Sequence, residues 1–459
     1  MTLTEYGYRP RLIDEQITKY MNLFGALSIE GPKWCGKTWT ALNHANSVVY
    51  MLDPENDYAN REAARLNAAS ILTGEKPLLV DEWQEVPGIW DAVRFASDRT
   101  REKGLYILTG SVTPKKGSFS HSGVGRIGKI RMRTMSLFES GDSSGAISLA
   151  GLFEGESIKP DISKLTQDKL IYLMVRGGWP GNIEWPESGE RPESGERPGI
   201  AGSSESTGKL GNTKSPGYTF LTKDDARILP DQYIAALADT DISSADNTKR
   251  NPELVLHLLT AIARTNVTSA KLSTIAADVQ SRFGGVTRQT VSDYLSILSR
   301  LHVVEEIPQW FPELRDKQRV RKAPKRMIAD PSIAVSALKA RSSDLARDPR
   351  TLGMVFENLC LRDLLVYSSI IGAKLSHYHD LNDLEVDVII ELDTKWAALE
   401  VKLGAHRVDE GATSLKRLQS KLILNGADPP SFLAVITGGG PLYTRDDGIH
   451  VIPIDCLRP

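Results

Sequence analysis

The sequence predicts an α/β protein with a parallel sheet in its N-terminal third, a helical unit in the middle and a second α/β unit at the C-terminal end. Two observations lead to this fold class. Over residues 1–140, short apolar runs alternate with helix-forming stretches, as in a parallel sheet covered by helices on both faces. From residue 251 apolar residues recur at helical spacing, and after residue 351 strand-like runs return. At roughly 150 residues per domain, the 459 residues predict about three domains.

A glycine-rich turn marks the first domain, which we expect over residues 1–183. The turn follows an apolar run at residues 26–29 and fits the pattern G-x-x-x-x-G-K-[ST], a phosphate-binding loop (P-loop) between a strand and a helix. Backbone N–H groups of such a loop surround phosphate oxygens, its lysine neutralises the β- and γ-phosphates, and its hydroxyl can coordinate Mg²⁺. We therefore expect ATP and Mg²⁺ as cofactors. Lys37 is also expected to act in catalysis, and Thr38 to bind the metal ion. The predicted nucleotide-binding residues of the loop are Gly31, Pro32, Lys33, Trp34, Cys35, Gly36, Lys37 and Thr38.

Polar side chains end two further apolar runs, at residues 78–80 and 105–108. A carboxylate at the C-terminal end of a parallel strand points at the nucleotide crevice. Asp81 therefore suits Mg²⁺ binding through water, and Glu82 suits activation of the attacking water, which favours a hydrolysing enzyme over a passive nucleotide binder. Ser111 lies where a sensor of the γ-phosphate belongs, and a simple strand-terminating turn explains it equally well.

A basic stretch at residues 113–135 contains six Lys or Arg residues and no acid. Arg126 is the candidate arginine finger, because the glycines before it allow close approach. The simpler interpretation is a solvated basic face or a patch that faces DNA. The six residues are Lys115, Lys116, Arg126, Lys129, Arg131 and Arg133.

Residues 184–218 contain the unit Pro-Glu-Ser-Gly-Glu-Arg twice in succession, followed by mostly Gly, Ser and Thr. The burial of so small a number of apolar residues cannot offset the conformational entropy that the segment would lose on folding. We therefore expect a disordered insertion. Its six acids and four bases account for the whole net charge of −2. The rest of the chain is neutral, and any contact with DNA must therefore be local.

Three amphipathic helices followed by a hairpin are expected in residues 219–335, the order of a winged helix-turn-helix. Thr287 is the predicted N-cap of the third helix, whose polar side offers Arg288, Gln289 and Ser292 to base edges. The basic loop of the hairpin, the wing, suits contact with DNA phosphates, although a solvated charge run or a protein-contacting wing is the alternative. The basic residues are Arg315, Lys317, Arg319, Arg321, Lys322, Lys325 and Arg326.

The last domain, residues 336–459, contains a predicted hairpin at residues 385–403. A two-residue turn at Asp393-Thr394, or a longer loop of the same parity, aligns Asp387 with Glu400. These carboxylates then lie about 5 Å apart at Cβ, close enough to share a divalent cation. The same face carries Glu385 and Lys402, and the other face is apolar from Val386 to Leu403 apart from Lys395.

The order of these elements resembles a widespread group of prokaryotic AAA-type ATP-binding proteins. In that group a nucleotide-binding domain precedes a domain of unknown function whose end is similar to restriction-endonuclease folds. The resemblance covers nearly the whole chain apart from the low-complexity insertion. It rests on Tyr8-Arg9-Pro10-Arg11, Gly31 to Thr38, Val80-Asp81-Glu82, Leu108-Thr109-Gly110-Ser111, Gly125-Arg126-Ile127, Gly178-Trp179-Pro180 and Glu400-Val401-Lys402.

The resemblance implies a second site in the C-terminal domain. There Asp387 and Glu400 would bind a metal ion, Glu357 would add a ligand, and Lys402 would assist the nucleophile in DNA cleavage. The alternatives are a hairpin with a solvated, charged outer face and a nuclease fold retained for DNA docking without cleavage.

Composition excludes several classes of protein. The chain is 41% hydrophobic and 25% charged, ordinary for a soluble globular protein, and no apolar run or N-terminal signal indicates a membrane segment or secretion. Cys35, Cys360 and Cys456 are too scattered for a disulfide framework or a zinc site. We expect a cytoplasmic protein.

The expected function is a Mg²⁺-dependent ATPase of the AAA type whose nucleotide state controls DNA contact and, if the C-terminal site is active, DNA cleavage. The alternative is a nucleotide-switched regulator that binds DNA or protein without nuclease activity and hydrolyses ATP slowly. ATP and DNA are the expected partners, and a homo-oligomer is a further option.

Overall fold

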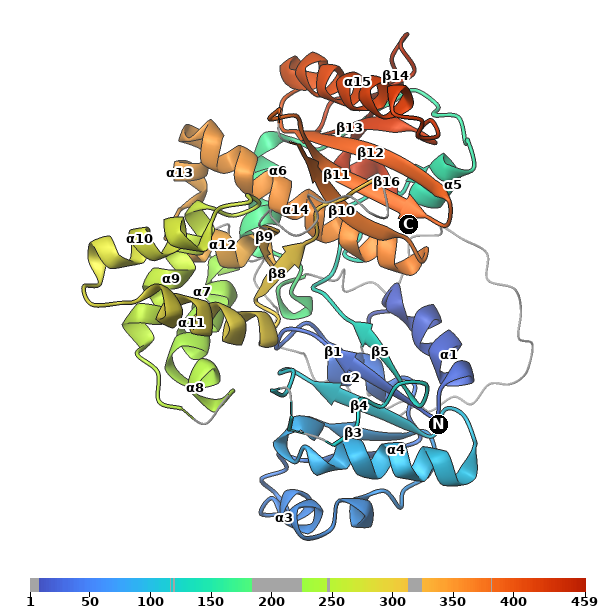
Figure 1. Cartoon of the computed structure of the whole chain (residues 1–459), viewed down its shortest axis with the longest axis vertical. Coiled ribbons are helices and arrows are strands. Elements are labelled where there is room, and N and C mark those ends of the chain that lie inside the picture. The colour runs from blue at the N-terminus through green and yellow to red at the C-terminus, as the bar shows by residue number, and fades with distance from the viewer. Residues whose placement is uncertain are drawn as a thin grey trace, which may run out of the picture.

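The computed structural model describes residues 8–115, 117–118, 120–183, 225–245, 248–312, 324–380 and 382–459. The nucleotide-binding unit lies at the bottom of Figure 1 in blue, the helical unit at the left in green and yellow, and the C-terminal unit at the top in orange and red. The predicted insertion and the greater part of the predicted wing, residues 313–323, lie outside the described residues.

The N-terminal sheet has five strands in the order β2-β3-β4-β1-β5, and every neighbouring pair is parallel. The α/β class and the parallel sheet predicted from the sequence are therefore confirmed. One face of the sheet is covered by α1 and α2 and the other by α3 and α4. The bounds are α1 Ile13–Leu23, β1 Ala26–Glu30, α2 Lys37–Leu42, β2 Ser47–Tyr50, α3 Ala59–Leu66, β3 Leu78–Asp81, α4 Gly88–Thr100, β4 Tyr106–Gly110 and β5 Ile127–Arg131.

The chain leaves this unit earlier than the expected boundary at residue 183. After β5, the short strands β6 and β7 pair with β16 and β14 of the C-terminal unit, and the apolar side of α6 lies in the C-terminal core. The boundary was misplaced because nothing in the local sequence indicates which core an apolar helix joins. The bounds are β6 Ile147–Ser148, α5 Leu149–Phe153, β7 Asp161–Ile162 and α6 Gln167–Arg176.

The middle unit contains the three predicted helices, α9, α10 and α11, followed by the antiparallel hairpin β8-β9. Thr287 caps α11 as predicted, because its side chain accepts a hydrogen bond from the Thr290 N–H. The expected boundary at residue 335 falls inside α12, which packs against α7 and α9. The bounds are α7 Ile228–Ala236, α8 Ile242–Ser244, α9 Pro252–Arg264, α10 Leu272–Arg282, α11 Arg288–Arg300, β8 Val304–Ile307, β9 Lys325–Ile328 and α12 Pro331–Ala337.

The C-terminal unit is built on a mixed sheet of seven strands in the order β10-β11-β12-β13-β15-β14-β7. Residues of α14 pack on one face and residues of α15 on the other. The bounds are α13 Ser342–Arg347, α14 Pro349–Ile370, β10 Lys374–His379, β11 Glu385–Leu392, β12 Lys395–Lys402, α15 Val408–Leu424, β13 Leu433–Thr437, β14 Pro441–Thr444, β15 His450–Pro453 and β16 Leu457–Arg458.

The predicted turn of the β11-β12 hairpin is confirmed, because Leu392 pairs with Lys395. The predicted faces need one correction. Between β10 and β11 the register shifts, so that Asp387 and Val388 together oppose His377. Such a β-bulge moves the side chains of the preceding residues to the opposite face of the sheet. Val386 therefore packs on the α15 side, whereas Val388 packs on the α14 side.

Asp330 joins all three units. Its Oδ2 accepts hydrogen bonds from Thr134 Oγ1 at 2.6 Å and from the Gly178 N–H at 3.0 Å, and it pairs with Arg362 Nη1 at 3.2 Å. Arg362 also pairs with Asp363 at 2.7 Å, and the three ionic side chains are at most 1% exposed. Because a buried charge is costly without a partner, this network fixes how the units meet. Of the described helices, none is long and apolar enough to cross a membrane.

Arg362→Ala should lower the free energy of unfolding by about 3–5 kcal/mol, because it leaves Asp330 and Asp363 buried without their cation. Urea unfolding followed by circular dichroism measures the change. The matched control is Arg407→Ala, which removes an exposed pair with Glu410 and should cost less than about 1 kcal/mol. Equal losses in the two variants would contradict the role given to Asp330.

Candidate nucleotide site

The phosphate loop connects β1 to α2 and needs glycine at two positions. A Cβ on Gly31 would lie 2.2 Å from the backbone oxygen of Met132, so no side chain fits there. Gly36 has φ of 99°, in the left-handed region that favours glycine. The chain thus passes close to the end of β5 and then turns sharply into α2, with Lys37 and Thr38 in its first turn.

Arg11 binds the backbone of the phosphate loop. Its guanidinium donates to the backbone oxygens of Cys35 at 2.8 Å and Arg133 at 2.9 Å, and it pairs with Glu139 at 2.9 Å. Both members of the Arg11–Glu139 pair are almost fully buried. In the sequence, Arg11 stands out only as part of a family motif. Its contact with Cys35 makes it a positioning residue for the loop.

Asp81, at the end of β3, lies beside the loop as predicted. Its Oδ1 accepts hydrogen bonds from Thr38 Oγ1 at 2.8 Å and Thr109 Oγ1 at 2.6 Å. Burial raises the pKa of Asp81, and the two hydroxyl groups act in the opposite direction. A hydroxyl and a carboxylate oxygen in contact are hard ligands of the kind that Mg²⁺ prefers, so the residues present fit this ion.

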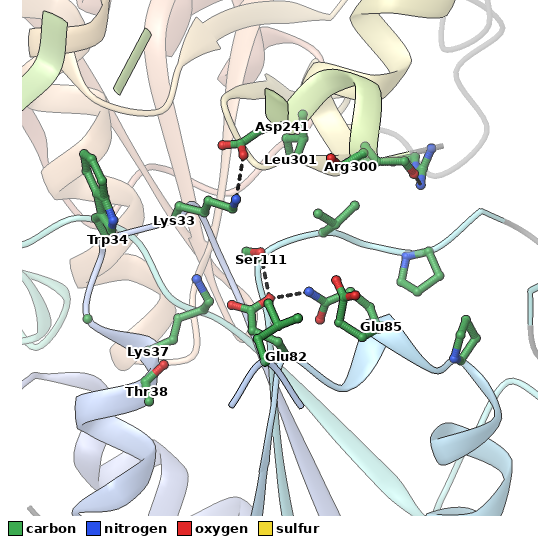
Figure 2. Close-up of a pocket in the computed structure, with 18 of the residues that line it drawn as sticks. Lys33, Trp34, Lys37, Thr38, Glu82, Glu85, Ser111, Asp241, Arg300 and Leu301 are labelled. Carbon is green, nitrogen blue, oxygen red and sulfur yellow. Dashed lines mark hydrogen bonds and ion pairs between the residues drawn. The ribbon is translucent and has the colours of Figure 1, made fainter. Parts of the chain in front are cut away.

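Glu82 follows directly in the left-handed conformation, with φ of 56°. Its Oε2 accepts hydrogen bonds from Ser111 Oγ at 2.9 Å and from the amide of Gln84. Figure 2 shows Glu82, Ser111, Lys37 and Thr38 around the same space. The structure therefore brings the predicted Glu82 and Ser111 together, and it adds Gln84, which orients the carboxylate.

A cavity of about 870 Å³ extends from the loop to the middle unit. Lys33 of the loop pairs with Asp241 at 2.6 Å, and the Trp34 ring meets Tyr233 edge-on with centroids 6.0 Å apart. Asp241 lies in the π-helical segment Leu237–Asp241, opposite the loop in Figure 2. The cavity is therefore lined in part by residues far from the loop in sequence, since Asp241 lies 208 positions after Lys33.

Arg300, the last residue of α11, also lines this cavity. Its guanidinium donates to the backbone oxygens of Thr113 and Ala245, both at 2.7 Å. No motif in the sequence marked Arg300 or Asp241. Only the packing of the middle unit against the end of β4 places them at the site.

Arg126 lies at the wrong end of the sheet to act as an arginine finger within its own chain. It precedes β5, where Ile127 pairs with Ala26 at the start of β1, whereas the loop follows the end of β1. Five residues of strand separate the two ends by roughly 16 Å. Arg126 instead pairs with Asp98 at 2.6 Å and does not line the cavity.

The predicted basic face at residues 115–133 is also interrupted. Arg131 and Arg133 pair with Glu305 of β8 at 3.2 and 2.9 Å, and Glu305 is only 6% exposed. Although burial acts to raise it, the two arginines hold the pKa of Glu305 at about 2. These two arginines therefore join two units through Glu305. Lys116 lies outside the described residues.

The four side chains predicted for the C-terminal site do come together. The carboxylates of Glu357, on α14, and Asp387, on β11, lie near each other. Lys402 contacts Glu400 and approaches Asp387 to 3.8 Å. A fifth residue, Lys325, lies between Glu357 and Asp387. Burial raises the pKa of Glu357 to about 7 against the opposing effect of Lys325.

This arrangement does not fit the predicted metal site. Within the described part of the chain, no group of three or more His, Cys, Asp or Glu side chains is arranged to hold a metal ion. The carboxylates that would serve as ligands are instead paired with the ammonium groups of Lys325 and Lys402. Lys325 was also predicted to belong to the DNA-contacting wing, but its side chain is 1% exposed and is not available for that contact. Arg326 is paired with Glu306.

Gly31→Ala should abolish ATP binding, because the added methyl group would meet the Met132 carbonyl and displace the loop. Titration with a fluorescent ATP analogue measures the affinity. Gly284→Ala is the matched control, since a Cβ there meets nothing within 4 Å and the variant should bind like the wild type. Retained binding in Gly31→Ala would show that the loop does not cradle the phosphates.

Comparisons with known proteins assign regions of this chain to domain families. Residues 24–140 match a family described as an AAA domain, and residues 352–457 match the domain of unknown function DUF4143. Residues 218–344 match a second domain of unknown function, DUF8612.

Two mycobacterial proteins are similar to this chain over most of its length. The uncharacterized proteins Mb2031c of Mycobacterium bovis and Rv2008c of Mycobacterium tuberculosis are each 22% identical over 431 residues, 93% of this chain and 79% of theirs. A Walker-type ATPase of Pyrococcus abyssi is similar in structure with a TM-score of 0.42 and 13% identity, over 73% of this chain and 97% of that one. Along the chain, an AAA domain, DUF8612 and DUF4143 are thus matched in that order.

Proposed function

We propose that this protein is a Mg²⁺-dependent ATPase in which Glu82 activates the attacking water. The observation that carries the proposal is the pair of carboxylates at the end of β3. Asp81 is hydrogen-bonded to the loop hydroxyl of Thr38, while Glu82 is held by Ser111 at the edge of the same cavity. A metal-facing group and a water-facing group side by side are what phosphoryl transfer to water requires.

The other residues bind and neutralise the phosphates. Lys37 is 5% exposed, and its ammonium lies 2.9 Å from the Pro32 oxygen, inside the turn where the phosphates belong. Mg²⁺, when bound beside Thr38 and Asp81, supplies positive charge to the β- and γ-phosphate oxygens. Gln84 and Ser111 limit the rotation of Glu82, so that its carboxylate stays directed at one position.

Glu82→Gln should lower steady-state ATP turnover by about 100-fold or more, because the amide cannot accept the proton of the attacking water. ATP affinity should stay within a few-fold of the wild type, since Glu82 does not belong to the phosphate loop. Phosphate release and analogue binding measure the two quantities.

The matched control is Glu85→Gln, an equal change of charge on another residue that lines the cavity, which should leave turnover nearly intact. Lys37→Ala should lose both binding and turnover. Turnover in Glu82→Gln equal to that of the wild type would remove Glu82 from the mechanism.

A second candidate function is a nucleotide-switched regulator that contacts DNA through the middle unit. The contacts of Lys33 and Trp34 with Asp241 and Tyr233 support it, because a phosphate bound in the loop competes with Asp241 for Lys33. The start of α11 supplies the candidate DNA contact, since Arg288 and Gln289 are exposed there. The predicted wing residues Arg315 to Lys322 lie outside the described residues, and their role stays a prediction.

Arg288→Glu should weaken binding to duplex DNA and reduce its dependence on salt, because one phosphate-neutralising charge is reversed. Fluorescence anisotropy at several salt concentrations measures this change. Arg99→Glu on α4 is the control for net charge and should bind as the wild type does. If ATP changes the affinity of the wild type, Asp241→Asn should reduce that dependence. DNA binding that is equal in all variants would exclude α11 as the contact.

A further inference from the structure

We propose that Lys325 is the resident cation of the carboxylate cluster in the C-terminal unit, so that the cluster binds no divalent metal and cuts no nucleic acid while β9 is docked. The cluster consists of Glu357, Asp387 and Glu400, with Lys325 and Lys402. This inference is independent of ATP hydrolysis, because it concerns a site in another unit.

The position of the ammonium group carries the proposal. Lys325 Nζ lies 2.6 Å from Glu357 Oε1 and 3.3 Å from Asp387 Oδ1, and its side chain is 1% exposed. A third carboxylate, Glu385, is 4.0 Å away. The ammonium thus occupies the point between two elements, α14 and β11, at which their carboxylates could share a metal ion.

A metal ion and this ammonium cannot occupy the cluster together. Mg²⁺ or Ca²⁺ needs carboxylate oxygens at roughly 2.0–2.6 Å, which would place it about where Nζ lies. Moving the ion aside would leave it within a few ångströms of a buried positive charge, with strong repulsion at low dielectric. The third carboxylate of the cluster, Glu400, is paired with the ammonium group of Lys402 and therefore already has a cation.

Burial alone does not exclude a metal from the cluster. Glu357 and Asp387 are 20% and 14% exposed, and both line a cavity of about 1,090 Å³. A hydrated ion therefore has access to their carboxylates, and Lys325 is the group that prevents binding.

The cation comes from a different unit than the carboxylates. Lys325 is the first residue of β9 and pairs with Ile307 of β8. The same hairpin carries Glu305, which is held by Arg131 and Arg133 of the nucleotide-binding unit. The hairpin is thus fixed to the nucleotide-binding unit through β8 and to the carboxylate cluster through β9, and metal could enter only if β9 moved away.

The test uses Mn²⁺ as the probe, with the full-length chain and no nucleotide, and counts bound ions by electron paramagnetic resonance. The wild type should show no Mn²⁺ that depends on Asp387, so that Asp387→Asn leaves the count unchanged. Lys325→Met, which keeps the volume and removes the charge, should gain an ion that Lys325→Met/Asp387→Asn loses again. Arg326→Met, the adjacent residue on β9, is the matched control and should gain none.

Two results would overturn the proposal. One is a wild-type protein that binds Mn²⁺ in a way that Asp387→Asn abolishes. The other is a folded Lys325→Met protein, verified by circular dichroism, that binds no additional Mn²⁺. If Lys325→Met does not fold without metal, its recovery on addition of Mn²⁺, and not of K⁺, supports the proposal. If Mn²⁺ fails to recover it, Lys325→Gln takes its place under the same criteria, while the wild-type result decides independently.

Discussion

Buried charge is the constraint on which this structure depends. An ionic side chain removed from water costs several kcal/mol unless a partner is held against it, so each buried pair requires two segments to meet in one arrangement. In this protein four such pairs lie where units or distant segments join. The pairs are Arg11–Glu139, Glu305–Arg133, Arg362–Asp330 and Lys325–Glu357.

The nucleotide cavity also depends on contacts between units. The N-terminal sheet supplies the phosphate loop and the two carboxylates, and the middle unit adds Asp241 and Arg300 to the lining of the cavity. Lys33 belongs to the loop and pairs with Asp241, so one ammonium group connects the loop to the middle unit. The hairpin β8-β9 extends this connection to the C-terminal carboxylates through Glu305 and Lys325.

Features set by neighbouring residues could be predicted from the sequence. These include the parallel sheet, the loop, Asp81 and Glu82, the Thr287 cap and the turn at residue 393. The errors share a cause in long-range pairing. Arg126 lies at the opposite end of the sheet because β5 runs parallel to β1, and Lys325 belongs to a basic run in sequence yet is buried among acids in space. The domain limit at residue 183 failed because α6 packs on a core formed much later in the chain.

The phosphate loop could be predicted without tertiary context, because the spacing of glycine, lysine and threonine in one turn is a local property of the sequence. The strand period and the turn also predicted that Asp387 and Glu400 align, whereas Glu357 was expected only from the resemblance. Which cation these carboxylates receive depends instead on how the units pack together. Lys325 reaches them from β9 of another unit, and the energy of pairing buried charges acts on distance in space, whatever the separation along the chain.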